Sequence, residues 1–290
     1  MAFSLTGKQQ EELEELSSKV ADLLMSYHSS LADNDNRGKR VAKFKAELIK
    51  KIITNPRGHK MDIVPGPLTY IEDLFGTRAS THSMESERFI DAYSSAKAIS
   101  NWGRDIRWRC YTVCWAAEHA MNIEGDFIEF GVDRGGLSTA VISYTNFEKT
   151  DKNFFLVDTY QGLVEDYISE KEQELNIVAD GRYPDCWDEV SNRFSKYDNV
   201  KPIRGAVPDV LPEIENLDKV SYCSIDMNCA APEVAALEYV WPKLSNGGLI
   251  IFDDYGFPKH QVQRDSLDEI ASGFGRSIYT LPTGQGLLVK

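Results

Sequence analysis

The sequence predicts an α/β fold in which a mostly parallel sheet follows a helical N-terminal extension. From residue 126 onward, short apolar runs alternate with amphipathic segments at the spacing of strands and helices. The first apolar run ends at a glycine-rich turn, Gly131 to Gly136, and acidic residues end three later runs. We therefore expect residues 1–84 to form a helical extension with a connector, and residues 85–290 to form the α/β domain.

The N-terminal extension contains an amphipathic segment. Apolar residues recur at steps of three and four through residues 8–31, which is typical of a helix with one apolar face. That face could form a short coiled coil, pack on the α/β domain, or contact a helix of a second subunit. We expect the protein to form a homo-oligomer. Further helices are predicted over 39–54, 85–100 and 104–121, with an irregular connector over 61–82.

The α/β domain has seven candidate strands. They are 126–130, 153–158, 200–204, 220–226, 248–253, 276–281 and 286–290. Helical patterns lie between them over 136–148, 185–197, 232–243 and 261–272. This alternation predicts a Rossmann-like, seven-stranded sheet with helices on both faces. A short turn at 282–285 joins the last two strands, so we expect one antiparallel strand at the sheet edge.

Composition limits the classes of function. The net charge is −13, although residues 1–60 hold 11 Lys and Arg against 8 Asp and Glu, so the rest of the chain is strongly acidic and nucleic acid is not an expected partner. No apolar run approaches about 18 residues, so no membrane span is expected, and the N-terminus does not resemble a signal peptide. Five scattered cysteines favour free thiols and a reducing, cytoplasmic location.

Acidic residues lie at the carboxyl ends of the predicted strands, where ligands bind in open α/β sheets. Asp158 ends the second strand, 27 residues after Gly131, where an acid can accept hydrogen bonds from both hydroxyls of a ribose. The alternative for Asp158 is a capping or loop carboxylate. Glu129 could orient the glycine turn or contact a ligand amino group, or it could be a buried structural acid. The turn does not fit Gly-x-Gly-x-x-Gly, which disfavours a nicotinamide dinucleotide, and no P-loop is present.

Three aspartates offer a set of hard oxygen ligands. Asp226 ends the fourth strand, and Asp253 and Asp254 end the fifth. Clustered carboxylates repel one another unless a cation or protons intervene, and hard oxygen ligands suit magnesium, calcium or manganese rather than zinc. The sequence therefore predicts a site for one of these divalent ions, which could orient a substrate hydroxyl. The alternative is helix capping by Asp253 or Asp254, with one acid paired to an arginine or lysine.

Four segments of the α/β domain form an ordered pattern: Glu129-Phe-Gly-Val-Asp-Arg-Gly-Gly136, Val157-Asp-Thr-Tyr-Gln-Gly-Leu163, Ser224-Ile-Asp-Met-Asn228 and Trp241 to Gly256. This pattern resembles the macrocin O-methyltransferase family of class I S-adenosylmethionine-dependent methyltransferases. The resemblance runs from about residue 85 to the C-terminus. One difference is that the family usually shows Asp-x-Asp-Leu-Tyr where this chain has Asp226-Met-Asn-Cys-Ala230; Asn228 still offers an oxygen.

The resemblance implies Mg²⁺-dependent methylation of a sugar hydroxyl or another polyhydroxylated small molecule or glycan, with S-adenosylmethionine as donor. The turn at 129–136 would hold the amino acid part of the donor, and Asp158 its ribose. Asp226, Asp253 and Asp254 would fall on the family's metal ligands. The implied donor contacts are Glu129, Gly131, Val132, Arg134, Gly135, Asp158, Thr159 and Asp226.

Methyl transfer to oxygen also needs a group that removes the hydroxyl proton. We consider His260 and Asp226 as the catalytic residues, with Lys259 as another candidate base and Gln285 as a candidate lining of the acceptor pocket. Two other functions remain open. A nucleotide-sugar or dinucleotide oxidoreductase predicts nicotinamide binding, and a non-catalytic cofactor-binding module predicts ligand binding without turnover.

Overall fold

The computed structural model describes residues 69–72, 75–77 and 79–290, together with the helical positions Glu11, Glu15, Ser18, Lys19 and Asp22. The chain divides after residue 66, and residues 67–290 form one compact unit. The helix predicted over 39–54 lies outside the described residues, and the helix predicted over 8–31 is described at those five positions. Oligomerisation through this segment therefore stays a prediction.

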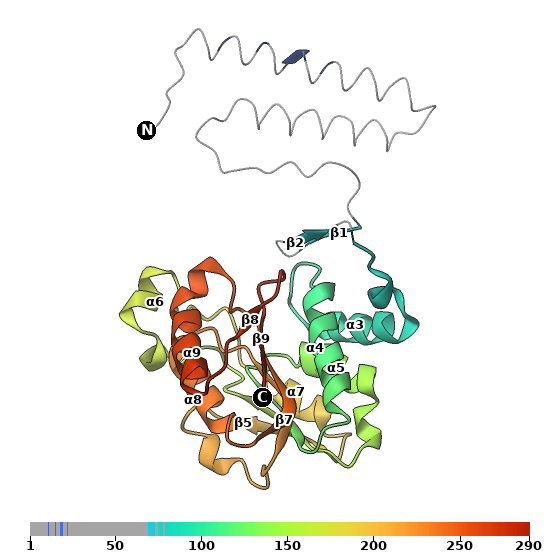
Figure 1. Ribbon diagram of the computed structural model, residues 1–290, viewed down its shortest axis with the longest axis vertical. Helices are drawn as coiled ribbons and strands as arrows, with labels where there is room; N and C mark the ends of the chain where they lie inside the picture. The colour runs from blue at the N-terminus through green and yellow to red at the C-terminus, as the bar shows by residue number, and fades with distance from the viewer. Residues whose placement is uncertain are drawn as a thin grey trace. The chain divides into compact units, whose positions relative to one another are not determined.

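The compact unit is built on a seven-stranded sheet with the order β5-β4-β3-β6-β7-β9-β8 (Figure 1). β3 to β7 run parallel, β9 runs antiparallel beside β7, and β8 pairs with β9 at the edge. This confirms the predicted fold class. The chain moves outward from β3 in one direction and from β6 in the other, so the strand order reverses between β3 and β6. The strands are β3 Asp126–Phe130, β4 Phe154–Asp158, β5 Val200–Arg204, β6 Val220–Ile225, β7 Leu244–Phe252, β8 Tyr279–Thr280 and β9 Gly286–Val289.

Helices cover both faces of the sheet. The helices α3, α4 and α5 pack on one face, and α8 and α9 pack on the other (Figure 1). Short 3-10 turns connect several elements, among them Phe147–Lys149 and Pro258–His260. The helices are α3 Glu87–Ile99, α4 Arg107–Ala120, α5 Gly136–Thr145, α6 Glu170–Glu174, α7 Trp187–Phe194, α8 Ala230–Val240 and α9 Gln261–Gly273.

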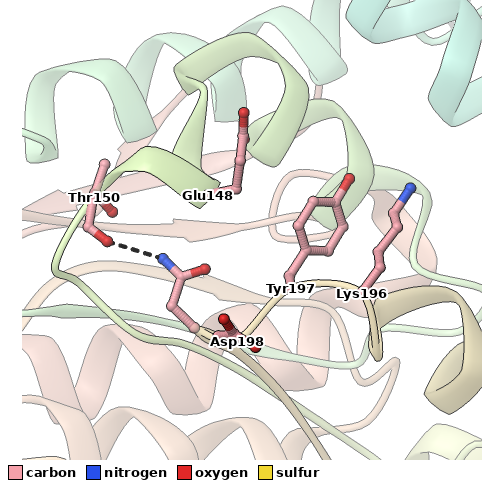
Figure 2. Close-up of a pocket in the computed structure, with 6 residues that line it drawn as sticks. Glu148, Thr150, Lys196, Tyr197 and Asp198 are labelled. Atoms are coloured by element: carbon pink, nitrogen blue, oxygen red, sulfur yellow. Dashed lines mark hydrogen bonds between the residues drawn. The ribbon is translucent and has the colours of Figure 1, made fainter.

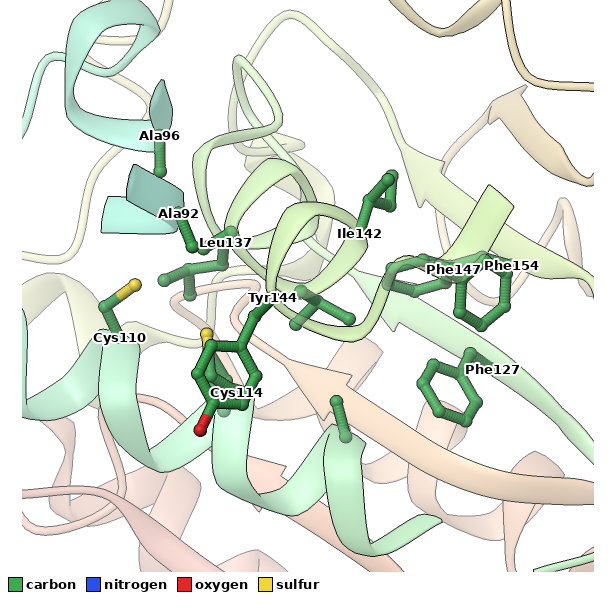
Figure 3. Packing of buried hydrophobic residues seen from close by; sticks show 14 of the residues in the cluster. Ala92, Ala96, Cys110, Cys114, Phe127, Leu137, Ile142, Tyr144, Phe147 and Phe154 are labelled. Atoms are coloured by element: carbon green, nitrogen blue, oxygen red, sulfur yellow. The ribbon is translucent and has the colours of Figure 1, made fainter. Parts of the chain in front are cut away.

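Aromatic side chains fill the core between the sheet and the first helical layer. Phe127 of β3 lies 4.9 Å from Phe147 and 5.0 Å from Tyr222 between ring centroids. Figure 3 labels Phe127 and Phe147 of this core together with Cys110 and Cys114 of α4, which are both buried thiols. Truncating a fully buried Phe typically costs about 3–5 kcal/mol, so this cluster holds α4 and α5 firmly against the strands that carry the site.

A small hairpin precedes the helical layer. β1 (Tyr70–Glu72) pairs antiparallel with β2 (Phe75–Thr77), in a segment expected to be an irregular connector. The Tyr70 ring packs edge-on against Trp108 of α4 at 5.7 Å, so the hairpin belongs to the same compact unit as the sheet. Across the described positions, no helix combines the length and apolarity needed to cross a membrane.

Candidate functional site

A cleft of about 810 Å³ lies at the carboxyl ends of the parallel strands. Its volume falls within the range of small-molecule and cofactor pockets. Residues that follow β3, β4, β6 and β7 line it, and it therefore lies where the strand order reverses. The other lining comes from the segment 100–109 before and at the start of α4, and from the loop that follows β4.

The turn after β3 requires glycine at two positions. Gly131 has φ +83°, and a Cβ there would lie 1.8 Å from the backbone oxygen of Asp226. Gly135 has φ +78° and caps α5 at its N-terminus. At Gly131 the positive φ and the close backbone oxygen both exclude a side chain. This lets the end of β3 pass directly beside the end of β6. Gly131, Val132 and Asp133 line the cleft.

Asp158 ties this turn to the end of β4. Its Oδ2 accepts hydrogen bonds from the backbone N–H of Val132 and of Asp133, the latter at 2.7 Å. Its Oδ1 accepts from the N–H of Tyr160 at 2.7 Å. The Thr159 hydroxyl lies 3.3 Å from Oδ1 but donates to the Gly162 carbonyl at 2.6 Å. A carboxylate has about four acceptor positions, so one position on Oδ1 is open to a ligand.

Glu129 is buried beneath the cleft. Its side chain is 2% exposed, and its Oε2 accepts a hydrogen bond from the Ser138 hydroxyl at 2.7 Å. Burial raises the pKa of Glu129 to about 8, and the Ser138 hydrogen bond offsets part of this shift. The carboxyl lines the cleft and is mostly protonated near neutral pH, so it can both donate to and accept from a ligand.

The three aspartates predicted as a cluster do lie together. Asp226, Asp253 and Asp254 all line the cleft, at the ends of adjacent strands β6 and β7. Burial raises the pKa of Asp226 well above its usual range, and the charges of Asp253 and Asp254 raise it further. The charge of Arg109 opposes this rise and so favours the ionised carboxylate that a general base needs.

Their arrangement does not fit the magnesium ion expected from the sequence. The guanidinium of Arg109, in the first turn of α4, lies 2.5 Å from Asp253 Oδ2 and 3.8 Å from Asp254 Oδ1. Among the described residues, no three His, Cys, Asp or Glu side chains are placed so that they could hold a metal ion. The alternative of an acid paired with an arginine is the arrangement that the structure adopts.

His260 lies behind the cleft and does not line it. The ring is 1% exposed, and Nε2 lies 3.3 Å from Asp254 Oδ2, within ion-pair distance but not aligned for a hydrogen bond. Nδ1 faces the amide oxygen of Gln263, whose Nε2 donates to Glu233 at 2.8 Å. This contact places the proton on Nδ1, so His260 holds an ion pair with Asp254 only when the ring is doubly protonated. His260 therefore contacts Asp254 from behind, and nothing places it against an acceptor.

Other predicted residues have different partners. Arg134 points away from the cleft and pairs with Glu189 of α7 at 2.6 Å. Gln285 is fully buried and donates to Asp253 Oδ1 at 3.0 Å, so it orients that acid instead of lining a pocket. Lys259 and Thr159 do line the cleft.

Sequence patterns missed the lining from residues 100–109. Trp102 and Arg109 face the cleft, and a Cβ on Gly136 would lie 2.7 Å from the Trp102 ring. One weak signal for Arg109 was available. The first turn of α4 carries Arg107 and Arg109 and no acid, although the helix N-terminus disfavours positive charge.

A second, smaller pocket of about 450 Å³ lies at the opposite ends of the strands (Figure 2). Glu148, Thr150, Lys196, Tyr197 and Asp198 line it, near the amino ends of β4 and β5. Its sixth residue, Asn199, donates hydrogen bonds to the carbonyl oxygens of Phe147, Thr150 and Lys152 at 2.9–3.2 Å. These bonds hold two chain segments together, which accounts for the polar lining.

Comparison with known proteins gives a consistent set of relatives. A family model described as Macrocin-O-methyltransferase matches residues 74–268. A mycinamicin III 3''-O-methyltransferase from Micromonospora griseorubida is 25% identical over 146 residues, 47% of this chain and 57% of the relative. A tetracenomycin-C rhamnosyl 4'-O-methyltransferase from Streptomyces olivaceus is 26% identical over 167 residues, 54% of this chain and 62% of the relative. The matched region thus spans about 60% of each curated relative.

Among solved structures, the O-methyltransferase NovP is similar, with a TM-score of 0.55 and 22% sequence identity. The similarity covers 63% of this chain and 79% of that protein. At this level of identity it supports the fold of the sheet and its helical layers.

Proposed function

Since the chain belongs to the macrocin O-methyltransferase family, we propose that it transfers a methyl group from S-adenosylmethionine to a hydroxyl of a small-molecule acceptor. The observation that carries this proposal is the cleft, where the glycine turn after β3 meets the acids that end β4, β6 and β7. The Streptomyces olivaceus relative is named for 4'-O-methylation of a tetracenomycin-C that carries a rhamnosyl group, so we extend the acceptor class to a sugar or similarly polyhydroxylated group.

The donor would lie over the glycine turn. Gly131 leaves open backbone beside the cleft, Glu129 offers a carboxyl to the donor's amino group, and Asp158 offers its open Oδ1 position to one ribose hydroxyl. When bound, S-adenosylmethionine supplies an electrophilic methyl group on a positively charged sulfur. Trp102 lines the same cleft and would exclude water from it.

Asp226 is the base that the geometry favours. It lies in the cleft between the turn and the acids of β7, and the charge of Arg109 favours its ionised form, which can take the proton from an acceptor hydroxyl as the oxygen attacks the methyl carbon. The Asn228 amide donates to Asp226 Oδ1 at 3.3 Å and orients the carboxylate. His260 would act through Asp254 as a positioning residue, since it reaches the cluster from behind.

The test is transfer of an isotopically labelled methyl group to a panel of acceptors that carry deoxysugars. We expect labelled product with the unaltered chain and a loss of at least about 100-fold with Asp226→Asn, the usual minimum effect of a general base. Asp218→Asn is the matched control, because Asp218 is an exposed acid just before β6 whereas Asp226 directly follows that strand. Donor binding without transfer to any acceptor would support a non-catalytic module instead.

A further inference from the structure

A guanidinium lies against two of the three acids of the cluster. The Arg109 side chain is 13% exposed, and its Nη1 lies 2.5 Å from Asp253 Oδ2 and 3.8 Å from Asp254 Oδ1. Its guanidinium carbon also lies 5.5 Å from the centre of the Phe257 ring, within cation–π distance. Arg109 is followed in α4 by the buried residues Cys110 and Val113, which anchor the helix that presents it.

Amide donors of the protein also bind two further oxygens of the cluster. Gln285 donates to Asp253 Oδ1 at 3.0 Å, so both oxygens of Asp253 have partners. Asn228 donates to Asp226 Oδ1 at 3.3 Å. A metal ion needs lone pairs on these same oxygens, whereas guanidinium and amide N–H groups are donors that compete with it.

The charge of the cluster leads to the same conclusion. Three neighbouring carboxylates need positive charge nearby to stay ionised, and an arginine carries that charge at any physiological pH. The Arg109 guanidinium lies within ion-pair distance of two of the three carboxylates, so its charge acts on them as the charge of a bound cation would.

We propose that Arg109 is the resident cation of the cluster formed by Asp226, Asp253 and Asp254, that it keeps divalent ions out, and that methyl transfer proceeds without one. The statement about methyl transfer rests on the proposed function, and the statement about cation binding does not. Removing the Arg109 charge should convert the cluster into a site for a divalent ion.

The experiment is a titration of the full chain with Mn²⁺, in which electron paramagnetic resonance reports the free ion. Mn²⁺ prefers oxygen ligands, as Mg²⁺ does. We expect no site tighter than about 1 mM in the unaltered chain, and one Mn²⁺ per chain with a Kd below about 1 mM in Arg109→Ala, within the affinity range of weak carboxylate sites. Adding Asp254→Asn to Arg109→Ala should remove the gained site.

Three further variants serve as controls. Arg109→Lys keeps the positive charge and should still exclude Mn²⁺. Arg107→Ala removes an exposed arginine of the same helical turn, which pairs with Asp105 at 2.8 Å, and should behave like the unaltered chain. Arg109→Gln repeats the test with a polar side chain, should Arg109→Ala not fold.

Two results would overturn the inference. The first is a site in the unaltered chain, tighter than about 1 mM and removed by Asp254→Asn. The second is that neither neutral variant of Arg109 gains a site. Labelled methyl transfer then separates the inference from the function: transfer that stops with EDTA and returns with Mg²⁺ would refute a metal-free reaction and leave the methyltransferase proposal intact.

Discussion

Replacing Asp158 by alanine should weaken binding of S-adenosylhomocysteine, the demethylated donor, by about tenfold to 150-fold. The structure leaves one acceptor position on Asp158 Oδ1, so the donor ribose can make one charge-assisted hydrogen bond. Such a bond contributes about 1.5–3 kcal/mol, and each 1.4 kcal/mol is a factor of ten in the dissociation constant. Removing the carboxylate also leaves the N–H groups of Val132, Asp133 and Tyr160 without this acceptor, so the thermal stability should fall as well.

Isothermal titration calorimetry measures the affinity, and Asp126→Ala separates binding from stability. Asp126 lies at the other end of β3, where its carboxylate accepts from the backbone N–H of Asn153 at 2.7 Å, far from the cleft-lining residues. The control should lose stability and keep its affinity for S-adenosylhomocysteine. An Asp158→Ala variant that binds as tightly as the unaltered chain would refute the ribose contact and leave Asp158 with a purely structural role.

Three other results are expected. Gly131→Ala should lower the free energy of unfolding in urea by at least about 3 kcal/mol, since the position combines φ +83° with a backbone atom 1.8 Å from the new Cβ. Gly181→Ala, at φ +71° with nothing within 4 Å of the new Cβ, should lower it by about 1 kcal/mol, and equal losses would contradict this. Burial raises the pKa of Glu233 to about 8 from 4.5, so the folded state keeps this side chain protonated after the unfolded state has ionised it. Stability should therefore fall between about pH 4.5 and 8, by at most about 5 kcal/mol. Glu233→Gln should raise the melting temperature at pH 9 more than at pH 5, and an equal change at both pH values would count against this. His260→Gln should lower kcat more than it raises KM, because His260 contacts Asp254 and does not line the cleft where the acceptor would bind; an unchanged kcat would remove the positioning role.

The sequence was sufficient to predict the parallel sheet because its strands are short apolar runs bounded by glycine and acids. β3 begins and ends at the predicted residues 126 and 130, and β5 at 200 and 204. β7 begins at Leu244 instead of 248, because its pairing with β6 shifts register around Gly247, which has φ +80°. Apolar periodicity does not reveal such an irregularity. The β1–β2 hairpin was missed for a related reason, since its strands have three residues each and lie beside a segment rich in proline and glycine.

The sequence predicted the acids of the candidate site but not the arginine that pairs with them. Asp226, Asp253 and Asp254 could be placed together because consecutive parallel strands end at the same edge of a sheet. Arg109 pairs with Asp253 across 144 positions of sequence, and only the packing of α4 beside β7 brings the two together. Helical periodicity predicts that residue 109 lies in a helix but does not identify the acid that its side chain meets. His260 was chosen for its proximity in sequence to Asp254, and the structure shows that it contacts this acid from the buried side.

The most direct test of the proposed function is a calorimetric titration of the full chain with S-adenosylhomocysteine, beside an identical titration with NADH. We predict one binding site per chain for S-adenosylhomocysteine at micromolar affinity, with or without Mg²⁺, and no heat from NADH. Binding of NADH, or no binding of S-adenosylhomocysteine, would contradict this prediction and would assign the cleft to a different cofactor.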